Sequence, residues 1–402
     1  MKKLLTLAAV AALCAPAAFA DEPVEEKNDS TGGFTFTEVK TIKTTPVKDQ
    51  NKSGTCWCFA TTSFLEDELL RKTGKEYDLS EMFSVYHCYM DKAEKYQRMG
   101  GTINFAQGGS AIDVPYVWEN YGAVPESVYD GLNYGEEKHD HYELADLLTA
   151  YMQAVTKSGR KKLSPAWKAG YEGILKSYFG ELPETFTYEG KTYTPKSFAE
   201  SLPLNMNDYI SVTSWTHHPF YTWFPVEVAD NWLWEKSWNV PMEEMKAIVD
   251  NALEKGYPVV WSADVSEPGF KWVKGYAILP EAKTEKDMTN TELSRWVKLS
   301  DKEREAEKYA TENGPVKEQT VTQESRQKGF DNLETTDDHG MELVGIATDQ
   351  NGNRYYKVKN SWDTNQIYDG FFYVSEPYFL AKTMGIYVNK EALPKESAKK
   401  LK

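Results

Sequence analysis

The chain has 402 residues, in which 61 aspartate and glutamate residues outnumber 46 lysine and arginine residues, so its formal net charge is −15. This acidic balance argues against nucleic acid and anionic membrane surfaces as partners, because both attract basic proteins. A chain of this length exceeds what one hydrophobic core organises, so two or more subdomains are expected.

Residues 1–20 have the features of a secretory signal peptide. A basic start precedes a short apolar core, and Ala18-Phe19-Ala20 provides a cleavage signal before an acidic stretch. We therefore expect a secreted or periplasmic protein; a membrane anchor and lipid attachment at Cys14 are the alternatives. Residues 21–36 are predicted to form a flexible lead-in. No other apolar run is long enough for a membrane span.

The segment 37–126 is predicted to form a helical half. Trp57–Lys72 carries apolar residues at helical spacing, a second helix is expected from Ser80 towards Gln97, and a third from Ala111 to Tyr121. A weakly alternating strand at Phe34–Ile42 precedes these helices.

Residues 50–60 carry the most informative motif of the chain. Gln50 stands six residues before Cys56, and Cys56-Trp57 opens a predicted helix. A helix N-terminus favours a thiolate, and an amide side chain held nearby can donate a hydrogen bond to an oxyanion. Cys56 alone would fit a buried structural cysteine, but its spacing from Gln50 predicts a nucleophile.

Three cysteines remain once the predicted leader is removed: Cys56, Cys58 and Cys88. An odd count leaves at least one thiol unpaired. The single residue between Cys56 and Cys58 does not match a C-x-x-C motif and no second ligand pair follows, so neither a metal nor another cofactor is expected. Cys58 is predicted to be a buried helix residue, with Cys88 as its neighbour.

The middle of the chain changes character several times. Residues 127–240 are mixed and rich in tyrosine and tryptophan, and they are predicted to be an insertion. Met242–Lys255 predicts a helix and Tyr257–Asp264 a buried strand, so residues 241–280 should start a β-rich half. Residues 281–328 are highly charged and are predicted to form a solvated helical insertion.

The last part of the chain is predicted to be rich in strands. Met341–Ala347 and Tyr355–Val358 should pair around a turn at 349–353, and Gly370–Val374 should form a further strand. A tail, residues 389–402, follows and ends in a lysine cluster.

His339 is the predicted partner of Cys56. It opens a predicted strand and should face a cleft, and an imidazolium beside a thiol can lower the thiol pKa to about 3–4. Asn360, 21 residues later, can accept a hydrogen bond from the imidazole, and Trp362 could shield that bond from water. The other histidines are weaker candidates, on a predicted helix face (His87), in a polar loop (His139, His141) or before a proline (His217, His218).

Three residues are predicted to contact a substrate: Gly108, Gly109 and Trp362. The two glycines would let backbone approach a peptide closely, although a plain loop is an equal alternative.

Together, the Gln50…Cys56-Trp57 box, His339 and Asn360-Ser361-Trp362 resemble the papain superfamily, peptidase family C1. The Cys-to-His separation of 283 residues and Gly108-Gly109 resemble, more narrowly, its bleomycin hydrolase / aminopeptidase C branch. The resemblance implies an α+β papain-like fold, a helical half plus a β-barrel half, with large helical and hook-like insertions. It further implies peptide substrates, a homo-oligomer (by analogy a hexamer), and a C-terminal arm whose carboxylate holds the substrate's free amino group.

The function predicted from these residues is an exported cysteine peptidase that forms an acyl-enzyme on Cys56 and acts as an exopeptidase from the N-terminus. An open-cleft endopeptidase and a non-catalytic envelope binding protein are the alternatives. The predicted organisation is a signal peptide (1–20), a lead-in (21–36), a helical half with the nucleophile (37–126), an insertion (127–240), the start of the β-barrel half (241–280), a charged insertion (281–328), the β-barrel half with His339 and Asn360 (329–388) and a tail (389–402).

Overall fold

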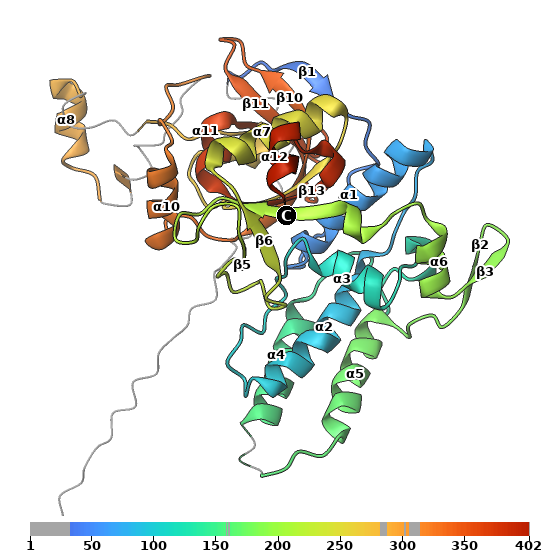
Figure 1. The fold of residues 1–402 in the computed structure, drawn as a ribbon. Helices are drawn as coiled ribbons and strands as arrows, with labels where there is room; N and C mark the ends of the chain where they lie inside the picture. Colours follow the sequence, from blue (N-terminus) through green and yellow to red (C-terminus); the bar gives the residue numbers. More distant parts are fainter. Residues whose placement is uncertain are drawn as a thin grey trace, which may run out of the picture.

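A computed structural model describes most of the chain. It covers residues 33–157, 159, 161–281, 288–300, 303–304 and 314–401. The predicted signal peptide, residues 1–20, therefore lies outside the described residues. In the part that is described, no helix is both long and apolar enough to cross a membrane. Figure 1 shows a helical part lying beside a part that is built on a large sheet.

The helical part forms where apolar residues recur at helical spacing. Its helices are α1 (Cys56–Thr73), α2 (Glu81–Arg98), α3 (Asp113–Asn120), α4 (Tyr142–Thr156), α5 (Ala166–Phe179) and α6 (Pro195–Ser201). The first three confirm the predicted helices, and Ser80 caps α2 by accepting a 3.1 Å hydrogen bond from the Phe83 backbone N–H. Buried residues of all six share one hydrophobic core. Short elements complete this part: η1 (Glu126–Val128), β2 (Phe186–Tyr188), β3 (Lys191–Tyr193) and η2 (Met206–Asp208).

One sheet organises the second part. Its strands are β1 (Thr37–Thr41), β4 (Tyr209–Thr213), β5 (Trp223–Pro225), β6 (Lys236–Asn239), β7 (Val259–Ala263), β8 (Phe270–Lys271), β9 (Tyr276–Ala277), β10 (His339–Thr348), β11 (Arg354–Lys359), β12 (Phe371–Ser375) and β13 (Thr383–Asn389). They follow the order β5-β6-β4-β13-β7-β10-β11-β12-β9-β8, with β1 paired to β10. The predicted hairpin is confirmed, since β10 and β11 pair antiparallel. Three strands from the predicted insertion, β4 to β6, join this sheet because β4 pairs with β13.

The remaining helices belong to the part of the chain that forms the sheet. They are α7 (Met242–Lys255), η3 (Trp272–Lys274), α8 (Asn290–Trp296), α10 (Gln323–Asp331), α11 (Glu376–Lys382), η5 (Lys390–Ala392) and α12 (Lys395–Lys400). The apolar residues of α7 and α11 complete a second hydrophobic core with the strands. In Figure 1, α8 stands away from the sheet, whereas α12 of the C-terminal tail lies beside α7. Helix α10 crosses position 328, where the predicted charged insertion ends.

Candidate active site

Helix α1 and strand β10 bring the start and the end of the chain together, because α1 begins at Cys56 and β10 begins at His339. Gly340 makes the contact between them. A Cβ added at Gly340 would lie 3.2 Å from Trp57 Cα and 3.4 Å from the Cys56 carbonyl oxygen. The Gly340 backbone also forms a hydrogen bond with the Cys56 thiol. A Cβ at position 340 would make the two segments shift by a few tenths of an ångström, so glycine allows their close approach.

His339 is held in one orientation by Asn360 and Trp362. Its Nε2 lies 2.7 Å from Asn360 Oδ1, which also accepts a 2.8 Å hydrogen bond from the Ser361 backbone N–H. Because that oxygen can only accept, Nε2 carries the proton and Nδ1 keeps a lone pair that can take one. The Trp362 indole stacks on the imidazole with 4.4 Å between ring centroids. It therefore covers one face of the ring, as the sequence predicts.

Cys56 is the least buried of the three cysteines. It is partly exposed, whereas Cys58 and Cys88 are fully buried, and all three are free of disulfides. Among the described residues, no hydrogen bond joins the Cys56 sulfur directly to the His339 ring; the backbone bond to this thiol from β10 comes from Gly340. Catalytic hydrogen bonds often tighten only when substrate is bound. In the enzyme without ligand, the neighbouring positions of Cys56 and His339 are therefore what matters.

Gln50 links the segment before α1 to the segment after β11. Its Nε2 donates to the Ser53 carbonyl at 2.7 Å, and its Oε1 accepts from the Ser361 hydroxyl at 2.7 Å. The Gln50 backbone N–H also donates to the Ser361 carbonyl at 2.8 Å. These bonds fix the amide and leave its second N–H to donate elsewhere. The arrangement can therefore hold a donor near Cys56 for a developing oxyanion.

Gly108 and Gly109 are packed closely by side chains. A Cβ at Gly108 would lie 2.0 Å from Asp230 Oδ2, and one at Gly109 would lie 2.8 Å from the Trp57 ring. The Trp57 indole N–H also donates to the Gln107 carbonyl at 3.1 Å. A side chain at Gly109 would overlap the Trp57 ring, and one at Gly108 would displace the Asp230 carboxylate, so the loop that they form is held against α1. Contact of these glycines with substrate stays a prediction.

Two protein-family models match this chain. The model of the papain family cysteine protease matches residues 34–245, and that of the Peptidase C1-like family matches residues 316–402. The first match alone spans more than half of the chain. The chain belongs to the papain family of cysteine proteases.

Relatives place this peptidase in the predicted aminopeptidase C branch. Aminopeptidase G of Lactobacillus delbrueckii subsp. lactis is 24% identical over an alignment of 394 positions that covers 88% of this chain and 83% of the relative. Aminopeptidase C of Lactobacillus helveticus is 23% identical over an alignment of 414 positions that covers 89% of this chain and 82% of the relative. The mitochondrial cysteine proteinase 1 of Saccharomyces cerevisiae (strain JAY291) is 23% identical over an alignment of 416 positions that covers 91% of this chain and 79% of the relative.

A solved structure, that of PepW from "lactobacillus rhamnosis" HN001, has the same fold as the peptidase. It superposes with a TM-score of 0.69 at 19% identity and covers 94% of this chain and 87% of its own. The predicted α+β papain-like fold is therefore confirmed.

Burial disfavours the charged form of both reactive groups of the peptidase. It raises the pKa of the Cys56 thiol to about 12, and the charges of Asp230 and Asp337 add to the rise. Burial also lowers the pKa of His339 to about 4, against the opposing effect of the hydrogen bond to Asn360. The resting ion pair with a lowered thiol pKa stays a prediction, because these shifts describe the desolvation of each charge by itself.

Two carboxylates near Cys56 were not predicted from the sequence. Asp337 stands two residues before His339, so its position on the chain could have revealed it. Asp230 belongs to the loop between β5 and β6, which no local motif connects to Cys56. A polar loop was predicted around His139 and His141, but both are buried, with 8% and 1% of their surface exposed, and pack among aromatic rings.

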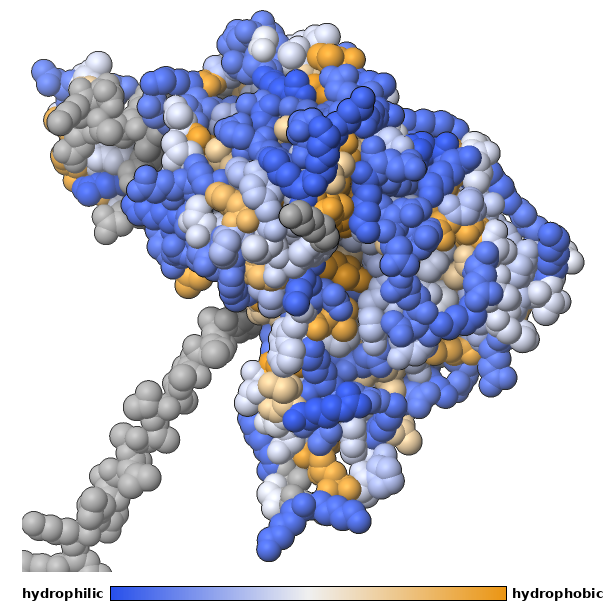
Figure 2. All heavy atoms as spheres, in the orientation of Figure 1, coloured by the Kyte–Doolittle hydropathy of each residue, from blue (hydrophilic) through white to orange (hydrophobic). Residues whose placement is uncertain are grey.

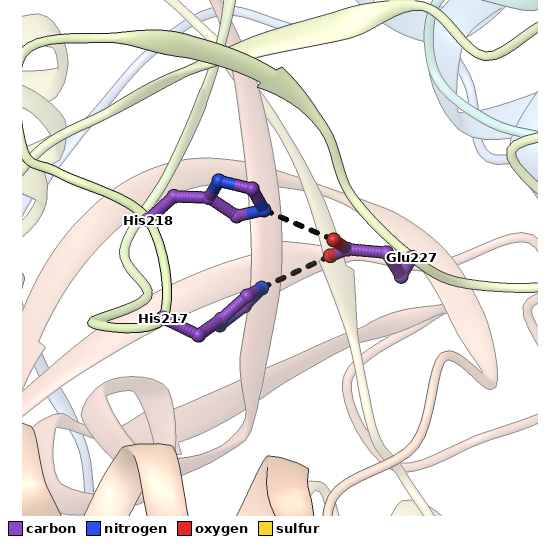
Figure 3. A group of neighbouring side chains, drawn as sticks. All are labelled: His217, His218 and Glu227. Atoms are coloured by element: carbon purple, nitrogen blue, oxygen red, sulfur yellow. Dashed lines mark hydrogen bonds and ion pairs between the residues drawn. The ribbon is translucent and has the colours of Figure 1, made fainter.

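A second polar cluster holds the loops that follow β4 and β5. Both His217 and His218 point at Glu227, each with its Nε2 3.0 Å from a carboxylate oxygen (Figure 3). Their ligand atoms lie within 4.8 Å of one another, close enough for a metal ion. However, the Gln327 amide donates to His217 Nδ1 at 3.0 Å while its oxygen accepts from the Thr216 N–H at 2.6 Å. His217 Nε2 therefore carries the proton and has no lone pair for a metal.

Proposed function

We propose that this peptidase removes residues from the N-terminus of peptides through an acyl-enzyme on Cys56. The observation that carries the proposal is the contact of Gly340 with α1, which puts a histidine already held by Asn360 next to a thiol at a helix N-terminus. Aminopeptidase action is favoured by the names of the relatives, which include aminopeptidases C and G.

In the first half of the proposed reaction, one proton moves from the thiol to His339 and then from His339 to the leaving amine. The Cys56 sulfur attacks the scissile carbonyl carbon while His339 Nδ1 takes the thiol proton. When the C–N bond breaks, the same nitrogen returns that proton to the leaving amine, and a thioester remains. Water then attacks the thioester, giving one proton to His339, which passes it to the departing sulfur. Asn360 keeps Nδ1 turned towards these partners throughout.

The negative charge that develops on the carbonyl oxygen needs donors in place before the reaction. The free N–H of the Gln50 amide and the Cys56 backbone N–H are the proposed pair. Both belong to fixed groups, since the Gln50 side chain has two hydrogen-bond partners and the Cys56 N–H starts a helix. Preorganised donors of this kind need no rearrangement in the transition state.

Hydrolysis of alanyl-aminomethylcoumarin and of its N-acetylated form tests the exopeptidase assignment. The wild-type enzyme should cleave the free amine at least about tenfold faster in kcat/KM, because an exopeptidase places a charged amino group next to the scissile bond. A Cys56→Ser variant should lose the activity on both compounds. Equal wild-type rates on the two compounds would rule out exopeptidase action, and unchanged hydrolysis by the variant would rule out the nucleophile.

An open-cleft endopeptidase is the second candidate, and the position of the tail favours it. The Lys400 ammonium bonds to Glu244 of α7 at 2.9 Å, and Leu401 packs against the second core. In its described part, the tail thus packs on α7 and makes no hydrogen bond to Cys56 or His339. The comparison of free and acetylated substrates separates the two candidates, since an endopeptidase accepts the blocked amine.

Export is part of the proposal and rests on residues 1–20. The signal pattern places the first mature residue at Asp21. N-terminal sequencing of the protein recovered from its native host should begin at Asp21. A sequence that begins at Met1 would contradict export by this route.

A further inference from the structure

An open hollow with a volume of about 60 Å³ lies beside the candidate active site. Its lining starts at Ser110, which follows Gly109, and reaches Ser262 of β7, which pairs with Gly340 of β10. Because Gly340 forms a hydrogen bond with the Cys56 thiol, the hollow adjoins the nucleophile. The lining also includes Val226, Val228, Met384 and Ile386, and the carboxylates of Glu235 and Asp337.

Asp337 brings a carboxylate without a partner into this hollow. Among the described residues, no hydrogen bond or ion pair reaches its oxygens, and burial, with the charges of Asp230 and Asp338, raises the pKa of Asp337 to about 7. The other two acids do have donors: Asp230 accepts from Asn104 at 3.0 Å, and Asp338 accepts from the Thr336 hydroxyl at 2.7 Å. A partly buried carboxylate that lacks a donor is costly unless a ligand supplies one.

Asp337 also acts against the nucleophile in the free enzyme. After burial, the charges of Asp230 and Asp337 are what raise the pKa of the Cys56 thiol. A cation bound at Asp337 would cancel part of this negative potential and make the thiolate easier to form. The position of the carboxylate therefore couples activation of the thiol to the arrival of a positive group.

The described part of the C-terminal tail does not supply a carboxylate here. Lys400 contacts Tyr221 and Glu244 at 2.9 Å each, so α12 is docked on the outside of α7. An arm that reaches the cleft from the tail was expected from the family resemblance. With the described tail docked elsewhere, Asp337 is an acidic group that the hollow itself provides.

We propose that Asp337 binds the α-ammonium group of the substrate's N-terminal residue. The inference rests on the proposed exopeptidase function and names the group that sets its specificity. An ammonium donates to a carboxylate through a charge-assisted hydrogen bond, which would fix the amine one residue before the scissile carbonyl. An acylated amine has no charge to offer and leaves the carboxylate buried without a partner, so blocked substrates are rejected.

The test compares kcat/KM for alanyl-aminomethylcoumarin and for its N-acetylated form in the wild type and in Asp337→Asn. The ratio of the two values is the readout, because the lost charge also changes the thiol and affects both substrates alike. We expect Asp337→Asn to reduce the free-amine preference by roughly 10- to 100-fold, mainly through KM, as expected for the loss of a charged hydrogen bond. Asp337→Glu keeps the charge and should retain most of the preference.

Glu235→Gln is the matched control, because it removes a negative charge from the exposed rim of the same hollow. It should leave the preference unchanged. Alkylation of Cys56 by iodoacetamide reports whether each variant still folds around the thiol. A blocked lysyl-leucyl and a blocked leucyl-leucyl substrate test whether the carboxylate binds a side-chain cation instead.

The outcomes separate the inference from the proposed function. A wild-type preference for the free amine that survives in Asp337→Asn overturns the inference and leaves the exopeptidase intact. Selective loss of lysyl-leucyl cleavage in Asp337→Asn, without loss of the free-amine preference, also overturns it. Absence of any preference in the wild type overturns the exopeptidase function itself, and the inference with it.

Discussion

Cys56 and His339 are buried enough that the ionised form of each is disfavoured. The proton transfer between them creates both charges at once, and their mutual attraction then offsets part of the desolvation cost of each. Activation of the thiol is therefore a joint property of the pair, and changes to either residue should affect the other.

The alkylation of Cys56 should depend on the protonation of His339. Because burial lowers the pKa of His339 to about 4, its ring is a neutral base above that pH and an imidazolium below it. Only the neutral ring can accept the thiol proton, so the rate constant for iodoacetamide should fall roughly tenfold per pH unit below about 4. Mass spectrometry of the intact protein measures this rate, with buried Cys58 and Cys88 as unreactive internal controls. A decline centred near the ordinary histidine value of 6.5 would contradict it.

Replacement of Gln50 by alanine should lower kcat by roughly 10²–10³ with little change in KM, because the amide N–H acts only on the charge formed in the transition state. Alkylation of Cys56 builds no oxyanion on a carbonyl, so its rate should stay close to that of the wild type. An equal loss in both measurements would show that Gln50 only supports the local structure, through Ser53 and Ser361.

The sequence predicts those residues of the site that stand in local motifs. Gln50, Cys56 and Asn360 stand in short, recognisable runs, and the structure gathers their segments around His339. Asp230 could not be found in this way, because its approach to Gly108 depends on how two distant loops pack. The shifted pKa values were also out of reach, since they follow from burial, which spacing does not reveal.

At the scale of elements, α1 meets β10 and β11 through buried charges. The Lys359 ammonium is 3% exposed and lies 3.6 Å from Asp67 Oδ2 and 3.9 Å from Glu342 Oε2. Burial, with the charge of Asp67, raises the pKa of Glu342 well above its usual range. Burial raises the pKa of Asp67 as well, and the charge of Lys359 favours the ionised form of both carboxylates. The lysine is needed where the helix packs on the sheet.

Lys359→Met should destabilise the enzyme by about 3–5 kcal/mol, because it leaves Asp67 buried without a counter-charge. Urea unfolding followed by tryptophan fluorescence gives the change in the free energy of unfolding. Lys357→Met is the matched control on the same strand, since Lys357 pairs with the exposed Glu38. The control should lose no more than about 1 kcal/mol. Similar losses in the two variants would refute the importance of the buried contact.

Elements with a strong period were predicted well, and those defined by distant partners were not. Helices α1, α2 and α7 and the β10–β11 hairpin carry their own periodic patterns and turns. The membership of β4 to β6 in the main sheet depends on pairing with β13, which lies more than a hundred residues away. Short strands without such a partner have no local signal that distinguishes them from an insertion.

At the scale of the whole molecule, the peptidase is acidic, and the face drawn in Figure 2 is mostly hydrophilic with separate, small hydrophobic patches. Its apolar residues are gathered in the two main cores instead. Assembly into a hexamer stays a prediction from family resemblance. The fold itself joins residues from both ends of the chain, and this joining is what the proposed chemistry requires.

The most direct test of the account is to find which residue carries the acyl group during turnover. Intact-protein and peptide mass spectrometry after rapid acid quenching of a slow ester substrate, such as alanine p-nitrophenyl ester, would locate it. The wild type should carry an alanyl adduct on the peptide that contains Cys56. The adduct should form more slowly in His339→Ala and should be absent from this peptide in Cys56→Ser. An adduct on another residue, or turnover that persists in Cys56→Ser with no acyl intermediate, would contradict the account.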